Sequence, residues 1–152
     1  MEPHQDPDFE RDRAFLIDSL VSLAFGLSVV YPDIKFEYDI PFWLDDEVEL
    51  NGKTKPAYAH MIDNSDRIFM MSYRDTAGAI YGVAEDEIGY AESVGKTLVL
   101  GVETYSEEGD DVSFMEEGKH YMYGEIEKLR AMLPEGFGVA IHWIKSWYDL
   151  KV

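Results

Sequence analysis

Hydrophobic and polar residues follow two different periods along this chain, and the changes of period mark its elements. Over residues 8–30 the apolar positions recur three and four residues apart, which predicts a helix. From 33 to 43 apolar side chains alternate with charged ones between two prolines, which predicts a strand. Residues 44–56 are polar, carry the turn signal Asn51-Gly52, and lead into a short helical segment at 57–62.

The rest of the chain repeats an order of strand and helix. Continuous apolar runs predict buried strands, and apolar residues at helical spacing predict helices, at 67–73 (strand), 76–94 (helix, ending at Gly95), 96–103 (strand), 115–133 (helix), 137–144 (strand) and 145–150 (helix). Such alternation is typical of an α/β fold with a parallel sheet, either a barrel or an open doubly wound sheet.

Composition narrows the choice of partners. The 152 residues, 46% of them apolar, are enough for one domain with a sizeable core. A net charge of -18 disfavours nucleic acid and anionic lipid as partners.

The longest apolar stretch, 20–31, is interrupted by Ser22, Gly26 and Ser28, which argues against a membrane span. Aromatic residues make up 14%, which suits either sugar stacking or an aromatic core.

Ionisable and aromatic residues gather where the predicted strands end. In parallel α/β folds the carboxyl ends of the strands meet at one rim, where functional side chains collect. The residues that we expect at this rim are Asp39 and Trp43 after the first strand, Tyr73, Arg74 and Asp75 after the second, Glu103 after the third, and His142 and Trp143 after the fourth.

Several of these residues allow more than one interpretation. Strand alternation places Glu103 on one face with Val99 and Gly101, either as a substrate-facing carboxylate, as the partner of Arg74, or as a cap of the loop that follows it. Alternation likewise places Tyr73 and Asp75 together. His142 fits an acid/base group, a ligand or a core histidine. Histidine pairs at metal-binding spacing are lacking, so we expect no metal and no cofactor.

Two strand segments resemble those of a known family. The segment RIFMMSYRD, residues 67–75, resembles the sixth strand of glycoside hydrolase family 18-like barrels, which ends in Met-x-Tyr-Asp. Met71 and Tyr73 match this motif, whereas the family's aspartate falls on Arg74, with Asp75 one place later. The segment GFGVAIHWIKSW is similar to the eighth strand, whose closing tryptophan lies under the sugar and corresponds to Trp143.

This resemblance implies that the chain is a (βα) half-barrel, equivalent to strands five to eight of a TIM barrel. Residues 1–152 would form a single domain that is a fragment of a larger eight-stranded barrel. Glu2 then takes the place of the proton donor at the end of a missing fourth strand. In a second pattern among barrel glycosidases, Glu2 and Glu103 would be acid/base and nucleophile.

The function implied by the resemblance is hydrolysis or binding of a polysaccharide by carboxylate acid/base chemistry. The implied catalytic residues are Glu2, Tyr73, Asp75 and Glu103, and the implied substrate-binding residues are Asp39, Trp43, Arg74, His142 and Trp143. Alternatives are a noncatalytic carbohydrate-binding or interaction protein on the same scaffold, and a barrel hydrolase of another type. A half-barrel leaves two strand edges unpaired, so we expect either a homodimer or a missing N-terminal half as partner.

Overall fold

The computed structural model describes residues 9–105, 109 and 111–152, with side chains from residue 12 onward. Its elements are, in chain order, α1 (Phe9–Val30), β1 (Glu37–Pro41), β2 (Glu47–Leu50), β3 (Lys53–Pro56), α2 (Ala57–Asp63), β4 (Arg67–Met71), α3 (Ala77–Gly82), α4 (Glu85–Ser93), β5 (Leu98–Glu103), α5 (Lys119–Met132), β6 (Gly138–His142) and α6 (Ile144–Asp149).

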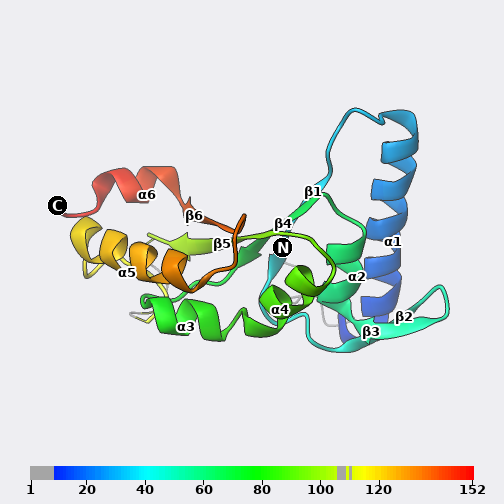
Figure 1. The fold of residues 1–152 in the computed structure, drawn as a ribbon, viewed down its shortest axis with the longest axis horizontal. Helices are drawn as coiled ribbons and strands as arrows, with labels where there is room; N and C mark the ends of the chain where they lie inside the picture. The colour runs from blue at the N-terminus through cyan, green and yellow to red at the C-terminus, as the bar shows by residue number, and fades with distance from the viewer. Residues whose placement is uncertain (1–8, 106–108, 110) are drawn as a thin grey trace.

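A four-stranded parallel sheet in the order β1-β4-β5-β6 forms the centre of the molecule (Figure 1). Each strand reaches its neighbour through helices, which is the connection that parallel strands require. The expectation of an α/β fold with four parallel strands is therefore confirmed.

The two faces of this sheet differ in burial. One face carries fully buried aliphatic residues, among them Ile68, Met70, Leu98 and Leu100, which pack with apolar residues of α2, α3, α4 and α5. The opposite face carries Phe69, Met71 and Val99, which are only partly buried by the described residues. We refer to it as the open face.

A two-stranded antiparallel hairpin, β2–β3, stands outside the main sheet. The sequence analysis predicted its turn but treated the flanking residues as a polar loop. Val48 and Leu50 are buried while Glu47 and Glu49 are exposed, so the strand pattern was present but masked by acidic residues. Asn51 and Gly52 have φ of 53° and 73°, the left-handed geometry of tight hairpin turns.

The helix predicted over 76–94 is in fact two helices, α3 and α4. Thr76 caps the first through its side chain, which accepts the Ala79 N–H at 3.4 Å. The break follows Gly82, a residue that weakens helices, and α4 begins with Glu85, Asp86 and Glu87 in its first turn. Acidic residues stabilise a helix start, so they favour a new helix at this point.

Helix α1 buries only part of its apolar surface. Ile17 and Ala24 are buried, whereas Phe15 and Phe25 are each 70% exposed. The stretch Asp12–Val30 has a mean hydropathy of 1.7 over 19 residues, so it is long and apolar enough to cross a membrane by length and composition. The small polar interruptions noted in the sequence therefore do not exclude a span.

Candidate functional site

A glutamate and a histidine meet at the carboxyl ends of β5 and β6. Glu103 and His142 are paired in the sheet register, and Glu103 Oε2 lies 2.7 Å from His142 Nδ1. Glu103 Oε1 accepts the backbone N–H groups of Thr104 at 2.6 Å and Tyr105 at 2.8 Å. Both oxygens of this carboxylate, which is only 3% exposed, are thus held in place.

The imidazole of His142 is oriented by this contact and open on its other side. Its side chain is 56% exposed, against 4% for Glu103. Among the described residues, none forms a hydrogen bond with Nε2. A ring held through Nδ1 by a buried carboxylate, with Nε2 facing outward, can give or take a proton at Nε2.

Tyr73, two residues after the end of β4, completes the cluster. Its ring stacks on the His142 ring, with centroids 5.7 Å apart and planes 24° from parallel. Gly101 lies beneath: a Cβ built on it would come within 3.1 Å of Tyr73 Cε1. Because glycine has no side chain, the tyrosine ring can cross β5 and reach His142.

Asp39 interacts with this cluster from the far edge of the sheet. Burial raises the pKa of Asp39, and the positive charge of His142 partly lowers it. Register places Asp39 and His142 on the same, open face of the sheet. We call the contacting residues Tyr73, Glu103 and His142, together with Asp39, the rim cluster.

Aromatic side chains flank the rim cluster after β6. Trp143 is 43% exposed and meets Tyr105 edge to face, with centroids 5.5 Å apart. The Lys145 ammonium lies 5.8 Å from the centre of the Trp143 ring. The peptide bond between His142 and Trp143 is cis.

Two hydroxyl groups that the sequence analysis did not single out fix this turn. Thr104 Oγ1 lies 2.8 Å from the His142 carbonyl oxygen and accepts the Trp143 N–H at 3.1 Å. It is also 2.7 Å from Ser146 Oγ. The only sequence signal for this role is the position of Thr104 directly after a buried strand.

Three other predicted site residues interact with residues outside the rim cluster. Arg74 does not pair with Glu103: it donates to the Tyr73 carbonyl at 2.7 Å, and its guanidinium lies 5.0 Å from the centre of the Phe42 ring. Strand β4 ends at Met71, so alternation does not extend to Asp75, whose charge acts on Tyr121 of α5. Trp43 is partly buried against the hydrophobic core.

Glu2 lies outside the described residues, so its predicted role as proton donor stays a prediction. Within the part of the chain that the structure describes, no three His, Asp or Glu side chains come together in a way that could hold a metal ion.

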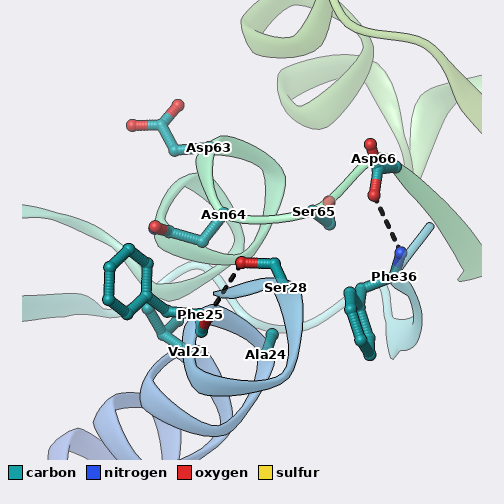
Figure 2. A pocket seen from close by; sticks show the side chains of 9 residues that line it. All are labelled: Val21, Ala24, Phe25, Ser28, Phe36, Asp63, Asn64, Ser65 and Asp66. Atoms are coloured by element: carbon teal, nitrogen blue, oxygen red, sulfur yellow. Dashed lines mark hydrogen bonds between the residues drawn. The ribbon is translucent and has the colours of Figure 1, made fainter. Parts of the chain in front are cut away.

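A pocket of about 260 Å³ lies at the amino ends of β1 and β4, next to α1 (Figure 2). Its lining combines apolar residues of α1 with the polar segment that joins α2 to β4: Val21, Ala24, Phe25, Ser28, Phe36, Asp63, Asn64, Ser65 and Asp66. Asp66 accepts the Phe36 N–H at 2.8 Å, and Asn64 donates to the His60 carbonyl at 2.8 Å. These contacts stabilise the local chain.

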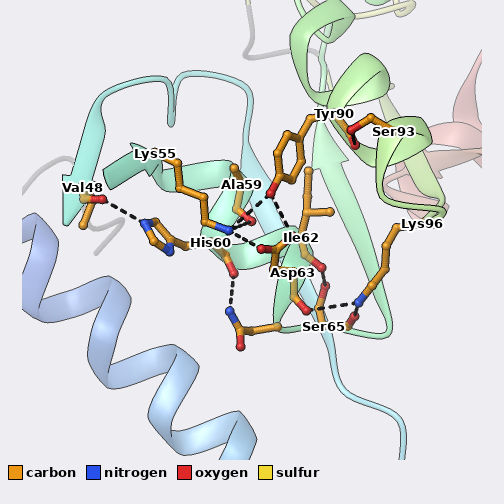
Figure 3. Close-up of polar contacts among 11 residues, drawn as sticks. Val48, Lys55, Ala59, His60, Ile62, Asp63, Ser65, Tyr90, Ser93 and Lys96 are labelled. Atoms are coloured by element: carbon orange, nitrogen blue, oxygen red, sulfur yellow. Dashed lines mark hydrogen bonds and ion pairs between the residues drawn. The ribbon is translucent and has the colours of Figure 1, made fainter. Parts of the chain in front are cut away.

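Next to this pocket, polar side chains satisfy one another (Figure 3). Lys55 forms an ion pair with Asp63, which also accepts the Tyr90 hydroxyl at 2.9 Å, while Lys96 donates to the Ser65 carbonyl. Burial alone would raise the pKa of Asp63, but hydrogen bonds from Lys55 and Tyr90 lower it below its usual value. We call these residues, Lys55, Asp63 and Tyr90, the amino-end network.

Comparison with known proteins gives no relative. No protein-family model, no curated protein and no solved structure matches this chain. The site geometry and the resemblance of the two strand segments are therefore the basis of the functional proposal.

Proposed function

We propose that this chain is the C-terminal half of a glycoside hydrolase-like barrel, which binds a polysaccharide at the rim cluster and cleaves it by acid/base chemistry. The observation that carries the proposal is the contact of Tyr73, Glu103 and His142 at the ends of β4, β5 and β6, with Asp39 of β1 on the same sheet face, which the described helices leave open. Functional residues of parallel α/β barrels lie at this end of the strands.

The chemistry of the cluster suits glycosidic bond cleavage. Such cleavage needs a group that protonates the leaving oxygen and a negative charge that stabilises the positive transition state. Asp39, whose pKa is raised by burial, keeps its proton to a higher pH than an exposed aspartate and suits the acid. The carboxylate of Glu103, held by two backbone N–H groups and by His142, suits the stabilising group.

Aromatic residues beside the cluster suit a sugar ring. Trp143 exposes its indole next to the ring of Tyr105. An aromatic face covers the C–H face of a pyranose, while polar groups around it bond the hydroxyls. We therefore assign Trp143 to substrate binding rather than to the core.

One observation favours a second candidate, a noncatalytic carbohydrate-binding protein on the same scaffold. Both carboxylate oxygens of Glu103 already accept hydrogen bonds, so this residue is poorly placed to act as a nucleophile. A site with a fixed Glu103 and an exposed Trp143 would still bind sugar without cleaving it.

The test is a glycan panel measured on the full chain. Release of reducing ends is followed together with binding by affinity electrophoresis, for the unchanged chain and for His142→Gln, Asp39→Asn and Trp143→Ala. His120→Gln is the matched control, because His120 is an exposed histidine on α5. We expect Asp39→Asn and His142→Gln to lower turnover by about a hundredfold, since acid/base groups contribute about that much or more.

The outcomes separate the candidates. Turnover that falls in Asp39→Asn while binding persists supports the hydrolase. Binding that is lost in Trp143→Ala, with no turnover on any glycan, supports the binding protein. No binding and no turnover on the panel would contradict both.

A further inference from the structure

The two edge strands of the sheet present unpaired backbone groups. Strand β1 pairs only with β4, and β6 pairs only with β5, within the described residues. Exposed edges of this kind readily pair with another strand, and proteins usually cover or block them. Pro41 blocks one position on β1, but β6 contains no proline and no Lys, Asp or Glu residue that would block it.

Apolar helix surface is exposed at both ends of the sheet. Helix α1 lies toward the β1 end of the molecule and α6 toward the β6 end (Figure 1). Phe15 and Phe25 of α1 are each 70% exposed, and Ile144 and Tyr148 of α6 are 74% and 76% exposed. A monomer normally covers surface of this kind, so it marks an interaction site.

We propose that two copies of this chain associate so that β1 of each copy pairs in parallel with β6 of the other, closing an eight-stranded barrel. The inference rests on the half-barrel part of the proposed function. In this arrangement the open faces form the barrel interior, and α1 of one copy packs beside α6 of its partner.

A second copy fits better than an unrelated partner for two reasons. Four strands and four more make eight, the number at which side chains just fill a barrel interior. A two-fold axis along the barrel uses both edges of both copies and leaves none open.

A dimer of this kind would bury the open face, the strand edges and the exposed apolar residues of α1 and α6. Four strands of about five residues cover roughly 300 Å² of open face per copy, from strand spacing and rise. Standard interfaces bury about 800 Å² per partner. The remaining area must come from the strand edges and from the exposed apolar residues of α1 and α6. The charge of -18 on each copy opposes association, so added salt should strengthen the dimer.

The test uses the absence of cysteine from the sequence. Single cysteines are introduced on β1 (Glu37→Cys) and on β6 (Gly138→Cys or Ala140→Cys), all on the open face by register. The unchanged chain is examined by sedimentation equilibrium over a range of concentration and salt. Glu92→Cys, on the exposed side of α4, is the control.

We expect a dimer in sedimentation, and disulfide cross-links only when the β1 variant is mixed with a β6 variant. Gly138→Cys fits the fold, since a Cβ there meets Val99 Cγ2 at an ordinary 3.5 Å. Cross-links within Glu37→Cys alone would show a different edge pairing and contradict the proposal. A monomer at every concentration, or a monomer that floats with neutral phospholipid vesicles through α1, would also contradict it.

The dimer and the proposed function fail separately. A dimer that binds no glycan keeps this inference and removes the carbohydrate proposal. A glycan-binding monomer does the reverse.

Discussion

The two ends of the sheet use polar residues in different ways. At the amino end, Lys55, Asp63 and Tyr90 bond to one another, and the network joins β3, α2 and α4. At the carboxyl end, Glu103 is held just as firmly, but its partner His142 keeps one ring nitrogen on the exposed side. Polar groups that bond only to one another stabilise a fold. A histidine that keeps one ring nitrogen accessible can also bond to a ligand.

The buried glutamate Glu87 provides a third case. It is 2% exposed, and its Oε1 has no hydrogen-bond partner among the described residues. Burial, with a smaller contribution from the charges of Asp45 and Asp86, raises the pKa of Glu87 to about 7 despite a backbone hydrogen bond that lowers it. The partners of a carboxylate, and not burial alone, therefore distinguish the three sites.

The largest effect on stability is expected for Glu103→Ala. This change leaves two buried backbone N–H groups and the imidazole of His142 without their acceptor, which should lower the free energy of unfolding by about 4 kcal/mol. Urea unfolding of this variant and of Glu92→Ala, an exposed glutamate on α4, measures the difference. Equal loss in both variants would mean that Glu103 is not fixed as described.

The next effect is a pH dependence caused by Glu87. Because its folded-state pKa is about 7 and the ordinary value is 4.5, the folded state keeps this proton longer than the unfolded state. The contribution of Glu87 to stability should therefore be fully present below about pH 4.5, and about 3 kcal/mol of it should be lost as the pH rises to 7.

Glu87→Gln isolates this contribution. The free energy of unfolding is measured from pH 4 to 8. Its decrease with rising pH should be smaller in Glu87→Gln than in the unchanged chain, whereas Glu92→Gln should keep the full decrease. An unchanged slope in Glu87→Gln would show that Glu87 has a partner or solvent access.

The smallest effect is expected for Lys55→Met in the amino-end network. Lys55 bonds to Asp63, Tyr90 and the Ala59 carbonyl in a partly exposed setting, so its loss should cost about 1 kcal/mol. Because its pKa is lowered in the folded state, Asp63 adds stability near neutral pH, which is lost as the pH falls through this lowered pKa. This loss of stability in acid should be smaller in Lys55→Met. Glycan binding should not change; a change would break the contrast between the two ends.

Periodicity predicted most of this fold because β4, β5 and β6 are mostly apolar and β1 alternates apolar with acidic residues. The run from Leu98 to Val102 is buried at every second residue and flanked by clear helix signals, so the position of β5 could be predicted from the sequence. Hairpin β2–β3 was not predicted from the sequence. Its strands have only four residues each, and Glu47 and Glu49 make β2 resemble a polar loop. The split between α3 and α4 depends on local capping and packing, which periodicity does not report.

For the candidate site, sequence reasoning found the residues but not their contacts. Strand ends placed Asp39, Tyr73, Glu103 and His142 at one rim because parallel strands share their direction. The choice of His142 over Arg74 as partner of Glu103 depends on sheet register, which joins β5 to β6. The role predicted for Asp75 stays a prediction, because β4 ends at Met71 and alternation along the strand does not fix the direction of residues beyond it.

Hairpin β2–β3 offers a place where this protein can gain sequence. Its tip, Asn51 and Gly52, is exposed and lies in the connection between β1 and α2, away from the rim cluster. Exposed turns of this kind tolerate insertions because few buried contacts depend on them. A longer loop, a tag or a whole added module could be introduced there, so the tip is a natural point for new specificity to evolve or be engineered.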